Sequence, residues 1–357
     1  MSREKERRLG VWEKYLTLWV TLCIGAGIGL GKFFPQISAI LGGLTVANIS
    51  IPVAVCLFLM IYPIMVQIDF RQVREAIRTP KPIVTTLVAN WAIKPFTMAL
   101  FAWLFMGVVF KGFLSPELAQ EYRAGMILLG VAPCTAMVLM WSYLARGNMG
   151  HTLVMTAINS LSMVVLYAPL ARFLLGISGI VIPWKTIAFS VAVYICLPLL
   201  FGYFTRTQAI KRKGAAWFES KLIPPLRTVS IVALLITLVI LFSLQGNIIV
   251  EIPAVVGMIA IGIFCNILFI FALTYLVSKP IRLSYEGAAP TAIIAGSNHF
   301  EVAVAVAITI FGISSGAALA TVIGVLTEVP FMLFLVWLCR KTRNFFYQPR
   351  LQYTGGK

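Results

Sequence analysis

Residues 130–137 read Gly-Val-Ala-Pro-Cys-Thr-Ala-Met and interrupt an otherwise apolar run. Pro133 has no backbone N–H, and it disfavours helical geometry at the residue before it. In a lipid environment an unpaired carbonyl costs several kcal/mol, so a broken helix persists only where protein or a polar cavity satisfies the freed groups. The stretch therefore predicts a membrane helix broken at Pro133, with the thiol of Cys134 and the hydroxyl of Thr135 at the break.

A second interruption lies late in the chain, at Gly-Ser-Asn-His over 296–299, and Glu301 follows it. Two broken helices with polar groups at mid-membrane depth are typical of secondary transporters. The two stretches together predict a transport site rather than a soluble active site.

The composition predicts a polytopic all-α membrane protein. Hydrophobic residues make up 60% of the 357 residues and charged residues 11%, and the mean hydropathy is +0.94. The net charge of +17 does not indicate nucleic-acid binding, because no basic run is interleaved with aromatic residues as a base-stacking groove requires. Six cysteines scattered singly argue against a disulfide framework or a metal site. The chain contains no phosphate-binding loop, so ATP is not expected to be the direct energy source. We expect no cofactor.

Apolar runs of about 20 residues, long enough to span a bilayer, predict ten transmembrane helices. The predicted spans are Tyr15–Phe34, Val46–Gln67, Ile83–Val109, Ala124–Leu144, Thr152–Leu175, Lys185–Thr205, Leu226–Leu244, Ile252–Val277, Gly287–Gly312 and Gly316–Cys339. Basic residues gather in alternate connections, so the positive-inside rule places both termini in the cytoplasm.

Ten spans divide into two halves of five, and an odd number per half requires the second half to insert upside down. Inverted repeats of this kind recur in secondary transporters, with the substrate site at the repeat interface. We therefore expect a first repeat at 1–175, a short linker at 176–184, a second repeat at 185–345 and a cytoplasmic tail at 346–357.

Two carboxylates fall inside predicted spans, Glu301 and Glu328. Ionisable groups are expensive at this depth and indicate function, so both are candidates for binding and releasing a proton. The alternative is a structural pairing, for instance with Lys94. Asn298 precedes Glu301 by three residues, a spacing that places both on one helical face.

The other polar residues inside the spans are predicted to support the site. Lys94 could neutralise a carboxylate or repel cations, or its stem could carry the ammonium towards the interface. For Asn90, Asn159 and Ser160 the alternative is interhelical hydrogen bonding. His299 is the one histidine inside a predicted span and could tune the proton chemistry.

Cys134 differs from the other cysteines because it lies at a predicted helix break. Freed amides at the start of a half-helix favour a thiolate or an anionic oxygen. A soft thiol suits a soft, thiophilic substrate, and a single thiol binds weakly enough to release it.

Several runs of the chain resemble the arsenite efflux permeases of the arsenical-resistance-3 type, in the bile acid/arsenite/riboflavin transporter superfamily. The matching runs are Ala132–Ser142, Asn90–Phe96, Ser297–Ala307, Phe311–Ile313, Ser315–Ala318 and Glu328–Pro330. Two departures fall near the predicted site. Related members usually read Asn-Asp where this chain has Asn159-Ser160, and a second Asn where it has His299.

The resemblance implies two inverted five-helix repeats in which helices four and nine are broken and cross. It also implies export of trivalent arsenic as arsenite across the plasma (inner) membrane, driven by proton influx; antimonite is chemically close enough to share the site. In the family the cysteine matching Cys134 is required for transport, and the glutamate matching Glu301 is the proton-linked acid. The predicted substrate-binding residues are Cys134, Thr135, Asn298, His299 and Glu301.

Two alternatives stay open at this point. One is a sodium-coupled organic anion carrier of the same superfamily, which dependence on sodium would identify. The other is an intramembrane enzyme or a sensor without transport. An enzyme would need a recognisable catalytic cluster, so the sequence favours a transporter.

Overall fold

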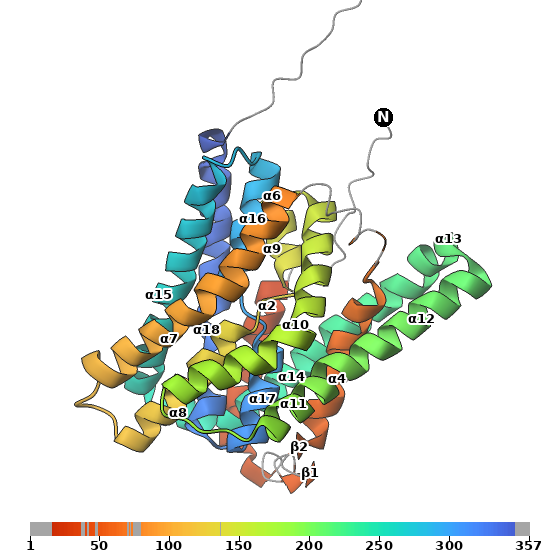
Figure 1. Cartoon of the computed structure of the whole chain (residues 1–357). Helices are drawn as coiled ribbons and strands as arrows, with labels where there is room; N and C mark the ends of the chain where they lie inside the picture. The colour runs from red at the N-terminus through yellow and green to blue at the C-terminus, as the bar shows by residue number, and fades with distance from the viewer. Residues whose placement is uncertain are drawn as a thin grey trace, which may run out of the picture.

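The computed structural model describes residues 16–346, apart from 37–39, 41, 42, 47, 48, 70, 72, 74–79 and 136. The predicted cytoplasmic tail beyond Phe346 lies outside the described residues, as do the basic residues at 3–14, 74 and 78 that the topology prediction uses. The described part is almost entirely helical (Figure 1).

In chain order the helices are α2 (Leu16–Phe33), α4 (Ile51–Val66), α6 (Pro80–Leu87), α7 (Lys94–Ala102), α8 (Pro116–Val131), α9 (Val138–Leu144), α10 (Met149–Ile177), α11 (Trp184–Val191), α12 (Leu197–Lys213), α13 (Ala215–Trp217), α14 (Ile223–Glu251), α15 (Pro253–Ser278), α16 (Tyr285–Gly296), α17 (Phe300–Phe311) and α18 (Gly316–Lys341). A short antiparallel pairing of β1 (Thr45–Val46) with β2 (Ile49–Ser50) precedes α4, and a 3₁₀ turn (Arg343–Phe345) follows α18.

The helices account for the apolar composition. Within the described residues, six helices are long and apolar enough to cross a membrane: Pro80–Val109, Met149–Ile177, Trp184–Lys213, Ala215–Gln245, Pro253–Ser278 and Gly316–Lys341. Shorter apolar helices occupy Leu18–Phe33, Ile51–Val66 and Phe300–Phe311. The prediction of a polytopic all-α membrane protein is confirmed.

Several predicted span boundaries were wrong. The second span begins at Ile51 rather than Val46, the sixth ends at Lys213 rather than Thr205, and the seventh ends at Glu251 rather than Leu244. The fourth begins at Pro116 rather than Ala124, because the Ser115 side chain accepts a hydrogen bond from the N–H of Leu118 and caps the helix. A proline in the first turn is compatible with this start, since its missing N–H would have no helical partner there. The seventh begins at Ala215 rather than Leu226.

Three long helices contain a π-helical turn that ends two residues before a proline. These pairs are Val88–Ile93 with Pro95, Ala192–Cys196 with Pro198, and Phe218–Leu222 with Pro224. A proline ring clashes with the carbonyl four residues earlier in a regular α-helix. A wider π turn relieves that clash and lets the helix continue.

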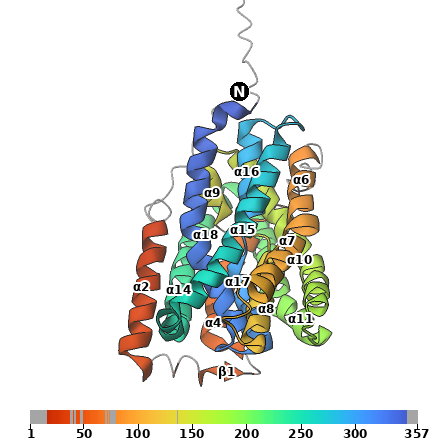
Figure 2. The ribbon, with the colours of Figure 1, turned by 90° about the vertical axis from the view of Figure 1, so that its left-hand side faces the viewer.

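The helices form two groups. The peripheral group comprises α2, α4, α12 and α14: α14 packs along α2 and α4, and α12 packs on α4. In Figure 2 α2 and α14 lie together at one side of the molecule. The central group comprises α6 to α10 and α15 to α18, in which α8 packs on α7 and α18, and α15 packs on α7 and α16. Helix α11 contacts α10 and α17 of the central group. It continues through the π-helical turn Ala192–Cys196 into α12 of the peripheral group, so it connects the two groups.

Small residues allow close approach where helices from opposite halves of the chain meet. A Cβ on Gly27 of α2 would lie 2.8 Å from the carbonyl oxygen of Val239 in α14. A Cβ on Gly125 of α8 would overlap the carbonyl oxygen of Ala317 in α18. Such small-residue contacts are the usual means by which membrane helices pack closely.

Two hydrogen bonds connect the ends of central helices from the two halves of the chain, one in each direction. At the start of α18, the N–H of Gly316 donates to Glu121 of α8 at 2.5 Å. Just before α10, the N–H of Asn148 donates to the carbonyl oxygen of Glu286 in α16 at 2.9 Å. In each case the start of a helix in one half binds the first part of a broken helix in the other.

Candidate functional site

The two predicted helix breaks are present, and they meet. The first lies between α8, which ends at Val131, and α9, which begins at Val138; the second lies between α16, which ends at Gly296, and α17, which begins at Phe300. Pro133 pairs with Asn298 in an antiparallel bridge, and the N–H of His299 donates to the carbonyl oxygen of Ala132 at 2.8 Å. Each break therefore satisfies part of the backbone that the other frees, as the interior of a membrane requires.

Glu328 of α18 binds the second break from one side. Its carboxylate accepts hydrogen bonds from the Ser297 hydroxyl, from the backbone N–H of Asn298 at 3.1 Å, and from the Asn298 side-chain amide at 3.2 Å. Glu328 is 4% exposed, so these donors replace the water that the charge has lost. The carboxylate thereby holds the backbone of the break in place.

Lys94 of α7 binds the same break from the other side. Its ammonium donates to the carbonyl oxygen of Ser297 at 2.8 Å, and the whole side chain is buried. The alternative in which its stem extends to the membrane interface was wrong, because a hydrogen-bond acceptor is available at mid-span. Ser297 is thus bound at its carbonyl by Lys94 and at its hydroxyl by Glu328.

Asn159 of α10 binds the backbone of the first break, as Lys94 and Glu328 bind that of the second. Its side-chain amide donates to the carbonyl oxygen of Cys134 at 3.4 Å, and its own oxygen accepts from the Asn90 side chain at 3.2 Å. Asn90 and Asn159 are both fully buried. The predicted interhelical hydrogen bonding of these two residues is confirmed, and it reaches the break itself.

Within the described residues Ser160 forms no hydrogen bond to either break. Its hydroxyl donates to the carbonyl oxygen of Thr156 within α10, at 2.9 Å. It lines a small cavity of about 10 Å³ between α4, α9 and α10, together with Gln67 and Leu139. Ser160 therefore faces the junction between the peripheral and central groups.

His299 and Glu301 form a close buried pair. His299 Nδ1 lies 2.7 Å from Glu301 Oε2, although the contact lacks the angle of a hydrogen bond. The prediction that Asn298 and Glu301 share a helical face was wrong. Since α17 begins at Phe300, Asn298 lies in the break, and its amide is directed to Glu328.

Several polar atoms beside the crossing have no hydrogen-bond partner in the described protein. They are Thr135 Oγ1, Asn298 Oδ1 and His299 Nε2, and each residue is at most 1% exposed. Buried polar atoms are nearly always partnered, so this grouping marks the crossing as a candidate position for a polar ligand. Cys134, which is 2% exposed, lies in the chain between Thr135 and the bridged Pro133.

Sequence reasoning placed Ser297 in the second interruption but assigned it no part in the site. The structure makes Ser297 the point where Lys94 and Glu328 converge. The sequence offered one indication that Ser297 belongs to the site: it lies beside Asn298, in a chain that has one lysine and two carboxylates at mid-span. Its partners lie 203 and 31 residues away, so the spacing could not reveal them.

A model of the sodium bile acid symporter family matches residues 54–252. The chain belongs to this family. It is 52% identical to an uncharacterized transporter of Synechocystis over 95% of this chain and 91% of the relative. It is 44% identical to the arsenical-resistance protein Acr3 of Alkaliphilus metalliredigens, over 95% of both chains. It is 35% identical to the Acr3 of Corynebacterium glutamicum, over 94% of this chain and 90% of the relative.

These relationships confirm the resemblance to the arsenical-resistance-3 type that the sequence motifs indicate. This member of the sodium bile acid symporter family is a transporter of the bile acid/arsenite superfamily and not an enzyme. The alternative of an intramembrane enzyme or a sensor is therefore set aside.

Proposed function

We propose that the protein exports arsenite from the cytoplasm in exchange for protons, through the crossing of the two broken helices. One observation carries the proposal: Cys134 lies at this crossing beside three buried polar atoms that have no partner in the described protein. The similarity to two arsenical-resistance proteins, over almost the whole chain, supports an arsenical substrate.

The chemistry of arsenous acid fits these groups. Trivalent arsenic is soft and binds thiols, so the Cys134 sulfur contacts the arsenic. The arsenic-bound hydroxyls both donate and accept hydrogen bonds. Asn298 Oδ1 accepts one, Thr135 Oγ1 takes either role, and His299 Nε2 takes the role that its tautomer allows. Antimonite presents the same chemistry and shares the site.

We assign the coupling proton to Glu301 before Glu328. Glu328 accepts from three donors, an arrangement that fits an ionised carboxylate and holds the break together. Among the described residues, Glu301 has one titratable neighbour within ion-pair distance, His299, with which it can exchange a proton. In the cycle Glu301 takes a proton from outside and releases it to the cytoplasm, while Glu328 and Lys94 set the local charge.

The proposed architecture is ten transmembrane helices in two inverted repeats, at 1–175 and 185–345. The reciprocal ties at the starts of α10 and α18 support it, as does the equivalent placement of Asn159 and Glu328 at the two breaks. The buried site corresponds to an occluded state. The central group rocks against the peripheral group to open the site to either side, with both termini in the cytoplasm and the protein in the plasma membrane.

A sodium-coupled anion carrier is the second candidate, because the description of the matching family names sodium symport. The two candidates differ in the ion gradient that they require. Uptake of arsenite into everted membrane vesicles, with sodium absent, tests this difference directly. Uptake that disappears when an uncoupler collapses the proton gradient supports proton exchange. Uptake that requires added sodium overturns it.

The role of Cys134 is tested in the same vesicles. Cys134→Ala is expected to abolish arsenite uptake while the protein stays folded, because the thiol supplies the contact to arsenic. Cys196→Ala is the matched control, since Cys196 lies in a π-helical turn away from the crossing and has no assigned role. Normal uptake by Cys134→Ala would refute the assigned arsenic contact.

A further inference from the structure

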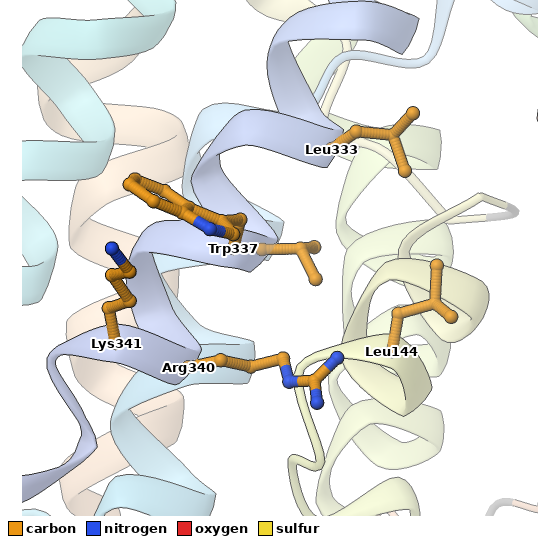
Figure 3. A pocket seen from close by; sticks show the side chains of 6 residues that line it. Leu144, Leu333, Trp337, Arg340 and Lys341 are labelled. Atoms are coloured by element: carbon orange, nitrogen blue, oxygen red, sulfur yellow. The ribbon is translucent and has the colours of Figure 1, made fainter.

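A pocket of about 520 Å³ lies away from the crossing, between the end of α9 and the last turns of α18 (Figure 3). Its lining residues are Leu144, Leu333, Val336, Trp337, Arg340 and Lys341. None of them takes part in the proposed transport site. Both walls belong to the central group, so the pocket is not the junction along which the two groups move.

The α18 wall changes from apolar to cationic along the helix. Leu333, Val336, Trp337 and Arg340 follow the spacing that places residues on one helical face. At 1.5 Å per residue, Leu333 lies about 10 Å along the axis from Arg340. The aliphatic side chains therefore lie deeper along the helix, and the two cations lie at its end.

The cations of this pocket, Arg340 and Lys341, form no ion pair with another residue that the structure describes. By contrast, Arg343 in the next turn pairs with Glu286 at 3.0 Å. Lys341 lies over the Trp337 ring, with its ammonium 4.4 Å from the ring centroid. Figure 3 shows the Arg340 guanidinium directed across the gap towards Leu144. The lining contains no carboxylate, so the pocket favours an anion.

The anion must also satisfy the apolar wall. Trp337 is 49% exposed in the protein alone, and tryptophan is enriched where a membrane helix meets the headgroup layer. Figure 2 shows α18 on the outer face of the bundle, where lipid has access. A guanidinium at this depth binds phosphate in a bidentate manner, and the aliphatic residues below it suit an acyl chain.

We propose that this pocket binds an anionic phospholipid. Arg340 holds the headgroup phosphate, Lys341 beside Trp337 adds positive charge at the same helix end, and the first part of an acyl chain lies along Val336, Leu333 and Leu144. Basic pockets between transmembrane helices on the cytoplasmic side are suited to anionic headgroups. Because Leu144 ends α9, the bound lipid contacts one half of the first broken helix.

The chain offers a matched control for the charge. Arg212 and Lys213 end α12 as Arg340 and Lys341 end α18, and Lys213 lies 4.2 Å from the Trp217 ring centroid. The pocket at α18 does not include them. The double variants R340Q/K341Q and R212Q/K213Q therefore remove the same charge from similar helix ends, but only the first empties the pocket of cations.

The experiment is native mass spectrometry of the delipidated full-length protein titrated with phosphatidylglycerol and, separately, with phosphatidylcholine. The wild type and R212Q/K213Q are expected to bind phosphatidylglycerol in preference to phosphatidylcholine. R340Q/K341Q should bind it roughly 30-fold more weakly, because it loses two juxtamembrane basic contacts. Leu144→Trp, which fills the pocket without changing the charge, should also weaken binding.

Four results would overturn the proposal. Equal losses in the two double variants would indicate general surface charge. Equal affinity for the two lipids would remove the anionic preference. Unchanged binding by Leu144→Trp would exclude the apolar wall. Displacement of the lipid by an equal concentration of glycerol phosphate would indicate a soluble anion instead. If R340Q/K341Q does not fold, Leu144→Trp and the choice between the lipids still decide the outcome.

Discussion

The two buried carboxylates are expected to respond differently to the same conservative change. Glu328→Gln keeps the size of the side chain but places an NH₂ group where an oxygen accepts from Asn298. Hydrogen bonds to a charged group contribute about 1.5–3 kcal/mol each, and a buried donor left unpaired costs about 1–3 kcal/mol. Glutamine retains one oxygen for the Ser297 hydroxyl and the backbone N–H, so the variant should lose about 3 kcal/mol of unfolding free energy.

Glu301→Gln should be far less destabilising. Among the described residues its side chain has one partner within ion-pair distance, His299, and that contact lacks the geometry of a hydrogen bond. We expect a loss of about 1 kcal/mol or less, because the neutral amide is easier to bury than the carboxylate. The main effect of this variant should be on transport, because arsenite uptake should no longer depend on the proton gradient.

Thermal unfolding of the purified variants, followed with a thiol-reactive dye, measures the difference, since both variants retain all six cysteines. The unfolding midpoint of Glu328→Gln should fall at least twice as far as that of Glu301→Gln. Uptake into everted vesicles is measured on the same preparations. Equal midpoints, or a lower midpoint for Glu301→Gln, would refute the assignment of Glu328 to the break and of Glu301 to the coupling proton.

Two further predictions concern residues that hold the fold around the site. Lys94→Met should lower the unfolding free energy by about 1.5–3 kcal/mol, because the carbonyl of Ser297 loses a charged donor; an unchanged midpoint would contradict this contact. Gly27→Ala should cost about 1–3 kcal/mol through its clash with Val239 of α14. Gly25→Ala is the control in the same helix, where a Cβ meets nothing within 4 Å, and it should be neutral or slightly stabilising. Equal effects of the two glycine variants would argue against the close packing of α2 on α14.

The sequence alone was sufficient to predict the membrane class, most span boundaries and both helix breaks. These features are local: a hydrophobic run of bilayer length is a helix whatever its neighbours are, and Pro133 interrupts one by its own geometry. The candidate polar residues were also evident, because any ionisable group in an apolar run stands out. The errors were at the starts and ends of helices: the Ser115 cap extended the fourth span beyond its apolar part, and the sixth span continues to Lys213.

Only the tertiary structure decided which polar groups bind each other. Pro133 meets Asn298, Lys94 reaches Ser297, and the Asn298 amide is directed to Glu328 rather than aligned with Glu301. These partners are far apart in the chain, and they are brought together because each break frees backbone groups that only another broken or polar segment can satisfy inside a membrane. Sequence spacing describes neighbours along one helix, but the pairing of two breaks depends on how separate helices pack.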